Sequence, residues 1–235
     1  MSSETDSHIV TIDGPAGSGK STVAWLLAHK LNVDFLDTGA MYRGIAAYVL
    51  DHDVAPTDSD AVVRFAESLD IRFIWAEDPP VLTVNGERLV ERLRDADVTA
   101  MVSVIAAISG VRDILVNVQR RIGREHPYLV TEGRDQGSVV FPDALAKFYL
   151  DASPEVRARR RADQLIAKGK VVDEAAILDE IRARDERDRS RANSPLVIPD
   201  DATHVDTSHL TIDEVVDRLA GIVRDRQAEP VLAAT

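Results

Sequence analysis

The segment 14–21, with the sequence GPAGSGKS, has the residue types and spacing needed to bind a polyphosphate. It matches the pattern G-x-x-x-x-G-K-[ST] at every fixed position. Glycines let backbone N–H groups wrap around phosphate oxygens, Lys20 can reach the β- and γ-phosphates, and the Ser21 hydroxyl is the expected Mg²⁺ ligand. A Gly-rich turn without a ligand is the alternative. An apolar run before the motif and a helical pattern after it favour the phosphate loop.

The residues expected to contact the phosphates of ATP are Gly14, Pro15, Ala16, Gly17, Ser18, Gly19, Lys20, Ser21 and Thr22. The loop alone does not say where the phosphate goes. The Asn-Lys-x-Asp base reader expected of a GTPase does not occur in the sequence, and a motor or helicase is normally larger. A small chain of this kind, with an inserted segment and a basic stretch, indicates transfer to a small acceptor.

Two further segments could hold that acceptor. DTGAMYR, at 37–43, and EGRD, at 132–135, each follow an apolar run that reads as a strand. Ligands of open α/β sheets bind beyond the carboxyl ends of the strands, which places Tyr42, Arg43 and Arg134 near a substrate. Glu132 is expected to face the metal or its waters, and Gly133 indicates close backbone approach. The alternatives are an N-cap at Thr38, a solvated arginine and an ordinary strand end.

Positive charge gathers between residues 155 and 191, with eleven Lys/Arg against nine Asp/Glu. Arginines at 157, 159, 160 and 161 stand near a helix start, where they oppose the helix dipole, so anion binding explains them better than helix stability. Arg184, Asp188 and Arg191 are spaced i, i+4 and i+7 on a helix that includes 182–191. A salt-bridged surface helix is the alternative for these three.

Alternating strand and helix patterns predict a doubly wound α/β fold with a parallel sheet. The predicted strands are 9–12, 33–36, 128–132, 146–150 and 204–206, and the predicted helices include 22–31, 110–124, 154–167 and 211–223. Ser153 with Pro154, and the capping box Thr211-x-x-Glu214, mark two helix starts. Residues 71–90 interrupt the alternation with antiparallel strand signals and Asn85-Gly86 at a hairpin turn, so we expect an inserted lobe.

Composition limits the class of protein. The chain has 235 residues, of which 45% are hydrophobic, and this suits one domain with a real core. A net charge of −12 argues against non-specific nucleic-acid binding. The absence of cysteine excludes disulfides and thiol chemistry and makes the cytoplasm the expected location. No membrane association is expected, because the start lacks a signal-peptide pattern and the uncharged stretch 98–111 is too short to span a bilayer. Both ends are expected to be loose.

Several long motifs in order resemble the bacterial cytidylate kinases. They are IDGPAGSGKS, FLDTGAMYR, GRDQGSVVFPDALAKFYLDAS, RDERDRSRANSPL and DATHVDTS. The similarity runs from about residue 9 to 219. It implies a P-loop nucleoside-monophosphate kinase fold with a parallel five-stranded core sheet flanked by helices. The core would comprise 1–38, 105–154 and 172–235, the monophosphate-binding lobe with antiparallel strands 39–104, and a short lid 155–171.

The resemblance also implies roles for individual residues. Arg43, Arg134 and Arg191 would clasp the acceptor's phosphate, and Arg184 and Asp188 would contact its sugar. Ser103, Arg112 and Asp135 would read the cytosine edge, and Thr38 and Tyr42 would complete the pocket wall. Lys20, Arg134 and the lid arginines Arg157, Arg160 and Arg161 would act on the transferring phosphoryl group, with Ser21 binding Mg²⁺ directly and Glu132 through water. Gln136 and Ser138 depart from the family's usual residues.

The activity implied is transfer of the γ-phosphoryl group of ATP to CMP or dCMP, in pyrimidine nucleotide metabolism, with Mg²⁺ required. The expected partners are these small molecules, and a monomer is expected. Two alternatives stay open. One is a kinase of another small acceptor, such as UMP or a non-nucleotide metabolite. The other is a P-loop sensor that binds ATP without turning it over.

Overall fold

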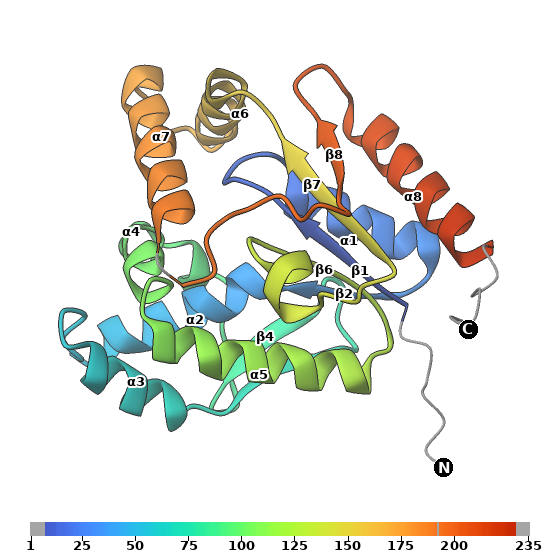
Figure 1. Ribbon diagram of the computed structural model, residues 1–235. Coiled ribbons are helices and arrows are strands. Elements are labelled where there is room, and N and C mark those ends of the chain that lie inside the picture. The colour runs from blue at the N-terminus through green and yellow to red at the C-terminus, as the bar shows by residue number, and fades with distance from the viewer. Residues whose placement is uncertain (1–7, 192, 229–235) are drawn as a thin grey trace, which may run out of the picture.

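A parallel five-stranded sheet forms the centre of the computed structural model, which describes residues 8–191 and 193–228 (Figure 1). The strand order is β2-β6-β1-β7-β8. The strands are β1 His8–Asp13, β2 Asp34–Asp37, β6 Tyr128–Gly133, β7 Ala146–Asp151 and β8 Thr203–Asp206. All five predicted strands are confirmed, with ends that differ by one residue at most. The ends predicted to be loose were 1–8 and 230–235. Residues 1–7 and 230–235 lie outside the described residues, whereas His8 was wrongly included because it is the first residue of β1.

Both faces of this sheet are covered by helices, which explains why its strands read as continuous apolar runs. Val10 and Val130 point to one face and pack with α1 (Lys20–Leu31) and α8 (Ile212–Ala228). Their neighbours Ile9 and Leu129 point to the other face, beneath α2 (Thr38–Asp51) and α5 (Ser109–Glu125). Because successive side chains of a strand alternate in direction, β1, β2 and β6 each contribute to two separate cores.

Helix caps predicted from the sequence are present. At α6 (Pro154–Ile166) the Ser153 hydroxyl accepts the Val156 N–H at 3.3 Å. At α8, the Thr211 hydroxyl accepts the Glu214 N–H at 3.3 Å while the Glu214 carboxylate accepts the Thr211 N–H at 2.8 Å, the reciprocal pair of a capping box. The helix predicted to include 182–191 is α7, Glu174–Ser190. The prediction was wrong for Arg191, which stands just beyond the end of α7 in extended backbone.

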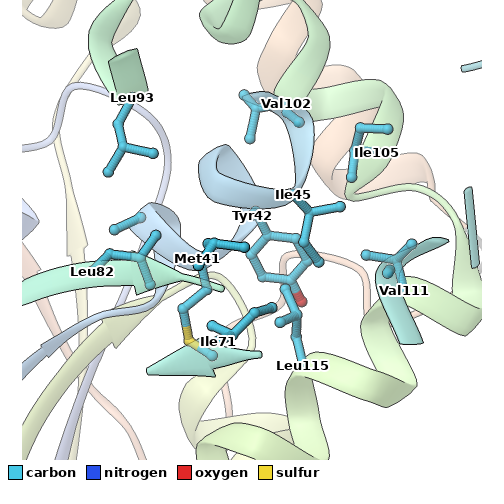
Figure 2. Close-up of a cluster of buried hydrophobic side chains, with 14 of the residues drawn as sticks. Met41, Tyr42, Ile45, Ile71, Leu82, Leu93, Val102, Ile105, Val111 and Leu115 are labelled. Carbon is cyan, nitrogen blue, oxygen red and sulfur yellow. The ribbon is translucent and has the colours of Figure 1, made fainter. Parts of the chain in front are cut away.

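The inserted lobe follows α2. It contains α3 (Ser59–Glu67), η1 (Arg92–Arg94), α4 (Ala96–Ile105) and an antiparallel sheet of β3 (Ile71–Ile74), β4 (Val81–Val84) and β5 (Glu87–Arg88). The predicted hairpin turn is confirmed, with positive φ angles of 52° at Asn85 and 80° at Gly86. Figure 2 shows the apolar cluster that joins this lobe to α2 and α5, including Met41, Ile45 and Leu115. The lobe therefore shares one core with the α2/α5 face of the sheet.

None of the described helices is by itself long and apolar enough to cross a bilayer. Taken together, α4 and α5 meet the length and composition criteria, but they are bent by 97° at their junction. Both helices contribute fully buried side chains to the core, among them Val98, Ile105 and Val111.

Candidate active site

A cavity of roughly 830 Å³, counting its open mouth, lies at the carboxyl edge of the sheet, beyond β1, β2 and β6. This is where an open α/β sheet is expected to bind ligands. The predicted site residues that line it are Ala16, Gly17, Lys20, Ser21, Thr38, Tyr42, Arg43, Ser103, Arg112, Glu132, Arg134, Asp135, Arg184, Asp188 and Arg191. Residues from six separate segments thus meet around one space.

The phosphate loop forms the end of the cavity nearest β1. Gly14, Gly17 and Gly19 have φ angles of 147°, 81° and 91°, which residues other than glycine rarely adopt. A Cβ atom at Gly14 would lie 2.0 Å from the Leu150 carbonyl oxygen, so this position also excludes a side chain by contact. The loop leads into the N-terminus of α1, whose free N–H groups favour a bound anion.

Lys20 is buried at the first position of α1, and its ammonium group donates to the Pro15 carbonyl at 2.7 Å. Burial lowers the pKa of Lys20 to about 7, and the neighbouring Arg134 acts in the same direction. A polyphosphate in the loop would reverse this shift, because negative charge close to an ammonium group favours its protonated form. The site is therefore electrostatically suited to a multiply charged anion.

Ser21 and Glu132 form the candidate metal position. The Ser21 hydroxyl donates to the Glu132 carboxylate at 2.7 Å. Burial raises the pKa of Glu132, and Asp37 nearby adds to the effect. Among the described residues no group of three His, Cys, Asp or Glu side chains could hold a metal ion. An oxygen-only pair fits Mg²⁺, which is commonly held by one or two protein oxygens together with substrate phosphates and water.

Four arginines, Arg43, Arg134, Arg184 and Arg191, line the same cavity. Arg43 pairs with Asp37 at 2.9 Å, and the Arg134 Nε donates to Asp188 at 2.9 Å. Burial lowers the pKa of Arg184 to about 10, an effect that Arg134 reinforces, and burial also lowers the pKa of Arg191. Burial is the main cause of both shifts, and a neighbouring arginine adds to each, Arg134 for Arg184 and Arg112 for Arg191.

Two of these guanidinium groups have unsatisfied donors. Within the described parts of the chain, the buried Nε of Arg184 and one buried terminal nitrogen of Arg191 lack a hydrogen-bond partner. A buried donor without an acceptor is costly, and more so when it carries charge. An anionic ligand between them would supply the missing acceptors.

A third group of polar side chains lines the cavity, made of Arg112, Asp135 and Ser103. Arg112 and Asp135 form an ion pair in which each side chain is only 4% exposed. The Arg112 guanidinium carbon lies 5.5 Å from the centre of the Tyr42 ring, and a terminal nitrogen donates to the Ala106 carbonyl at 3.2 Å. Ser103 projects from α4 beside them. Carboxylate, guanidinium and hydroxyl together offer both acceptors and donors to a planar base.

The three arginines expected on the lid do not line the cavity in this conformation. Arg157 is 1% exposed: it forms a two-pronged pair with Asp185 of α7, at 2.6 and 3.1 Å, and donates to the phosphate-loop carbonyl of Ala16 at 3.0 Å. Arg160 donates to the Thr207 carbonyl at 2.6 Å. Arg161 is exposed. The role expected of Arg157 stays a prediction: in this conformation its guanidinium joins α6, α7 and the phosphate loop.

Some lining residues were missed by sequence reasoning. Gly39, Val102 and Ala106 also line the cavity. The sequence could have indicated Gly39, because it lies within the segment DTGAMYR that was expected near the substrate. Val102 and Ala106 could not be recognised, because they are ordinary apolar residues of a helical run. The close approach expected at Gly133 is confirmed, since a Cβ atom there would lie 2.9 Å from both Gln136 and the Thr38 hydroxyl.

Known proteins share this sequence pattern. A profile of the family described as cytidylate kinase matches residues 10–225. The cytidylate kinase of Stutzerimonas stutzeri is 48% identical over 93% of this chain and 96% of that protein, and that of Vibrio parahaemolyticus is 43% identical over 97% and 100%. A shikimate kinase structure from Bacteroides thetaiotaomicron is 16% identical, covers 92% of this chain and 98% of that chain, and has a TM-score of 0.47, which adds nothing to the assignment. The chain belongs to the cytidylate kinase family.

Proposed function

We propose that the protein transfers the γ-phosphoryl group of ATP to CMP or dCMP, giving ADP and CDP or dCDP. The observation that carries this proposal is the pair of unsatisfied, buried guanidinium donors of Arg184 and Arg191. They lie in the same cavity as the phosphate loop, so beside the loop this space offers unpaired donors for the phosphate (Arg191) and the sugar (Arg184) of an acceptor. A protein that only binds ATP has no need of these additional donors.

Transfer in this site requires positioning and charge neutralisation rather than a general base, because a phosphate oxygen of the acceptor is already an anionic nucleophile. The new bond forms from that oxygen to the γ-phosphorus of ATP as the bond to the β-γ bridging oxygen breaks, and ADP leaves with that oxygen. Lys20, at the start of α1, would neutralise charge on the β- and γ-phosphates. Arg43, Arg134 and Arg191 would hold the acceptor's phosphate so that its attacking oxygen faces the γ-phosphorus opposite the leaving ADP.

Ser21 is the proposed direct ligand of Mg²⁺, and Glu132 the residue that orients it through water. The 2.7 Å hydrogen bond between them supports a shared position. When bound, Mg²⁺ neutralises charge on the phosphate oxygens of ATP. The backbone N–H groups of the loop and the start of α1 hold the same phosphates from the other side.

The rest of the acceptor would be recognised by α5, α7 and the turn after β6. Arg184 and Asp188 of α7 are the proposed sugar contacts. Asp135 would accept the exocyclic amine of cytosine, while Arg112 and Ser103 would donate to its ring acceptors. Thr38 and Tyr42 would complete the pocket wall. Because Asp135 is buried with Arg112, a base that lacks the amine would leave a buried acceptor unpaired.

The segment 155–171 is the proposed lid, between a core of 1–38, 105–154 and 172–235 and a monophosphate-binding lobe of 39–104. Within the lid, Arg160 and Arg161 are the proposed contacts to the transferring phosphoryl group after closure. Closure would exclude water and limit ATP hydrolysis. Arg157 would act with them from its buried position by fixing the Ala16 carbonyl, and with it the shape of the loop.

The proposed setting is the cytoplasm, with the protein acting as a monomer on small molecules and without nucleic-acid or membrane partners. Its lack of cysteine and net charge of −12 support this setting. Size-exclusion chromatography with light scattering measures the assembly directly, and a mass near 25.8 kDa is expected.

The experiment that tests the function is a coupled assay of ADP release with CMP, dCMP, UMP, AMP, GMP or no acceptor. CMP and dCMP should give the highest kcat/KM. Preference for UMP, or for none of these nucleotides, would support a different acceptor. ADP release without any acceptor would indicate an ATPase, and ATP binding without turnover would support the sensor. Asp135→Ala should reduce the preference for CMP over UMP, and an unchanged ratio would remove Asp135 as the base reader.

A further inference from the structure

Asp13, the last residue of β1, is a carboxylate that the proposed mechanism does not use. It is 2% exposed and does not line the cavity. Each of its two oxygens accepts one backbone N–H: Oδ1 from Gln136 at 2.9 Å and Oδ2 from Gly137 at 2.8 Å. The carboxylate therefore spans two consecutive amides of another segment, 123 and 124 positions away.

These two amides begin η2 (Gln136–Val140), the turn that follows the acceptor-binding pair Arg134 and Asp135. The Asp135 carbonyl accepts the N–H groups of Val139 and Val140 at 2.9 and 3.1 Å, so the backbone of Asp135 is part of the turn. Holding the first two amides of η2 in place therefore also holds the backbone of Asp135, the residue that immediately precedes them. Asp13 also pairs with Gly133 in the parallel β1–β6 register, which brings the two strand ends together.

The fit around the turn is close enough to transmit small displacements. A Cβ atom at Gly137 would lie 2.9 Å from the Thr11 hydroxyl and 3.2 Å from the Lys147 side chain. The Gln136 side chain is held as well, accepting from the Thr131 hydroxyl at 3.0 Å and donating to Gln119 at 2.9 Å. Close packing of this kind leaves a turn few alternative positions.

Burying this carboxylate is not favourable in itself. Burial raises the pKa of Asp13 to about 7, although the N–H groups of Gly137 and Gln136 act in the opposite direction. An apolar side chain would avoid the desolvation, but it could not accept two N–H groups at once. Asp13 also directly precedes Gly14. It is therefore joined by one peptide bond to the phosphate loop and by two hydrogen bonds to the turn η2, which follows Arg134 and Asp135.

We propose that Asp13 is a positioning residue that sets Arg134 and Asp135 relative to the phosphate loop, and so controls acceptor binding and the choice of base. The inference rests on the proposed function, because it assigns Asp135 to the base and Arg134 to the acceptor's phosphate. Asp13 acts through the backbone of the turn and does not touch either substrate. Its removal should therefore affect the acceptor far more than ATP.

The test is Asp13→Asn, which keeps the shape but presents an NH₂ group to one of the two N–H donors. KM for CMP should rise about tenfold, and the ratio of kcat/KM for CMP to that for UMP should fall about tenfold. The dissociation constant of MgATP should change less than twofold. Thr11→Val is the matched control. Thr11 lies on the same strand, is fully buried beside the same turn, and its hydroxyl has no partner within the described residues. This variant should keep all three values near those of the wild type.

The two proposals fail in different ways. If the wild-type protein does not phosphorylate CMP, the proposed function is wrong. If the wild type does so and Asp13→Asn keeps the KM and the CMP:UMP ratio, only the role of Asp13 is wrong. Equal weakening of MgATP and CMP binding would also overturn it, since that indicates a general packing role. Thermal melting checks folding. Should Asp13→Asn not fold, Asp13→Ser, whose hydroxyl can still accept one N–H, is measured by the same criteria.

Discussion

The acceptor side of the cavity and the surface around Arg92 are both clusters of arginine and aspartate, yet they differ in what completes them. Arg92 bonds with Asp51, Asp95 and Asp97 at 2.7 to 3.2 Å, and its own side chain is 26% exposed. In the cavity, Arg184 and Arg191 are partly buried as well, but each has a buried nitrogen atom without a hydrogen-bond partner among the described residues. The surface cluster is complete by itself, whereas the cavity cluster is incomplete until an anion binds.

This difference shows how the same residue types serve stability in one place and binding in the other. Exposed ion pairs gain little free energy because water screens them and side-chain entropy is lost. Buried like charges destabilise the free protein, and they give that free energy back when a ligand neutralises them. Buried donor atoms that lack an acceptor, rather than the number of arginines, therefore distinguish the candidate site from the surface.

The largest expected effect is that of Lys20→Ala in the cavity. Removing the buried ammonium group should lower kcat/KM for CMP phosphorylation by at least about a hundredfold, because it stabilises charge in a desolvated site. Steady-state kinetics with saturating MgATP measure this. A rate within tenfold of the wild type would contradict the role assigned to Lys20. It would also show that the charges of the cavity matter no more for the reaction than those around Arg92.

Asp188→Ala should have the next largest effect. Arg134 would lose its 2.9 Å partner and the proposed sugar contact would disappear, so KM for CMP should rise about tenfold or more. The dissociation constant of MgATP should change little. Isothermal titration with each nucleotide separates the two. Weakened ATP binding with an unchanged KM for CMP would contradict the assignment.

Arg92→Ala tests the other side of the comparison. Three carboxylates lose a partner, but all are about half exposed, so the free energy of unfolding should fall by about 1 kcal/mol or less. The values of kcat and KM should stay within twofold of the wild type. Urea denaturation and the coupled assay measure the two effects. A large loss of activity would show that this surface cluster also serves the reaction.

The smallest expected effect concerns His29 of α1 and Asp78 of the inserted lobe. His29 contacts the Trp25 carbonyl at 2.9 Å and Asp78 at 2.7 Å, and these two contacts raise its pKa. The pair of His29 and Asp78 therefore contributes fully to the free energy of unfolding below the pKa of His29 in the unfolded chain, about 6.5. This contribution is lost as the pH rises through the pKa of His29 in the folded protein. Asp78 has a lowered pKa, through Trp25 and His29, so its own contribution is lost only as the pH falls below about 4.

The measurement is the melting temperature of Asp78→Asn and of the wild type at pH 5.5 and 8.5. The difference between the two proteins should be larger at pH 5.5. Asp70→Asn is the control, because Asp70 pairs with Arg72, whose charge does not change over this range. If the difference in melting temperature between Asp78→Asn and the wild type is the same at both pH values, the protonation of His29 does not contribute to stability.

The sequence predicted the five strands of the sheet and most of the residues that line the cavity, because these depend on local patterns and long motifs. It gave no sign of the pair between Arg157 and Asp185, since nothing in a run of arginines shows that one of them will meet a carboxylate from another helix. Asp13 was overlooked for a similar reason. It reads as the polar end of an apolar strand, and its partners are backbone amides, which carry no sequence signal.

The order of strands in the sheet also has a consequence for biosynthesis. β1 lies between β6 and β7, and its first residue, His8, is in register with Tyr128, 120 positions later. While the chain emerges from a ribosome, β1 and the loop that follows it have no neighbouring strand until more than half of the protein has been made. Pairing over such a separation is slow and leaves an apolar strand unprotected. Nascent chains that end before β6 should therefore bind chaperones and be unable to retain ATP.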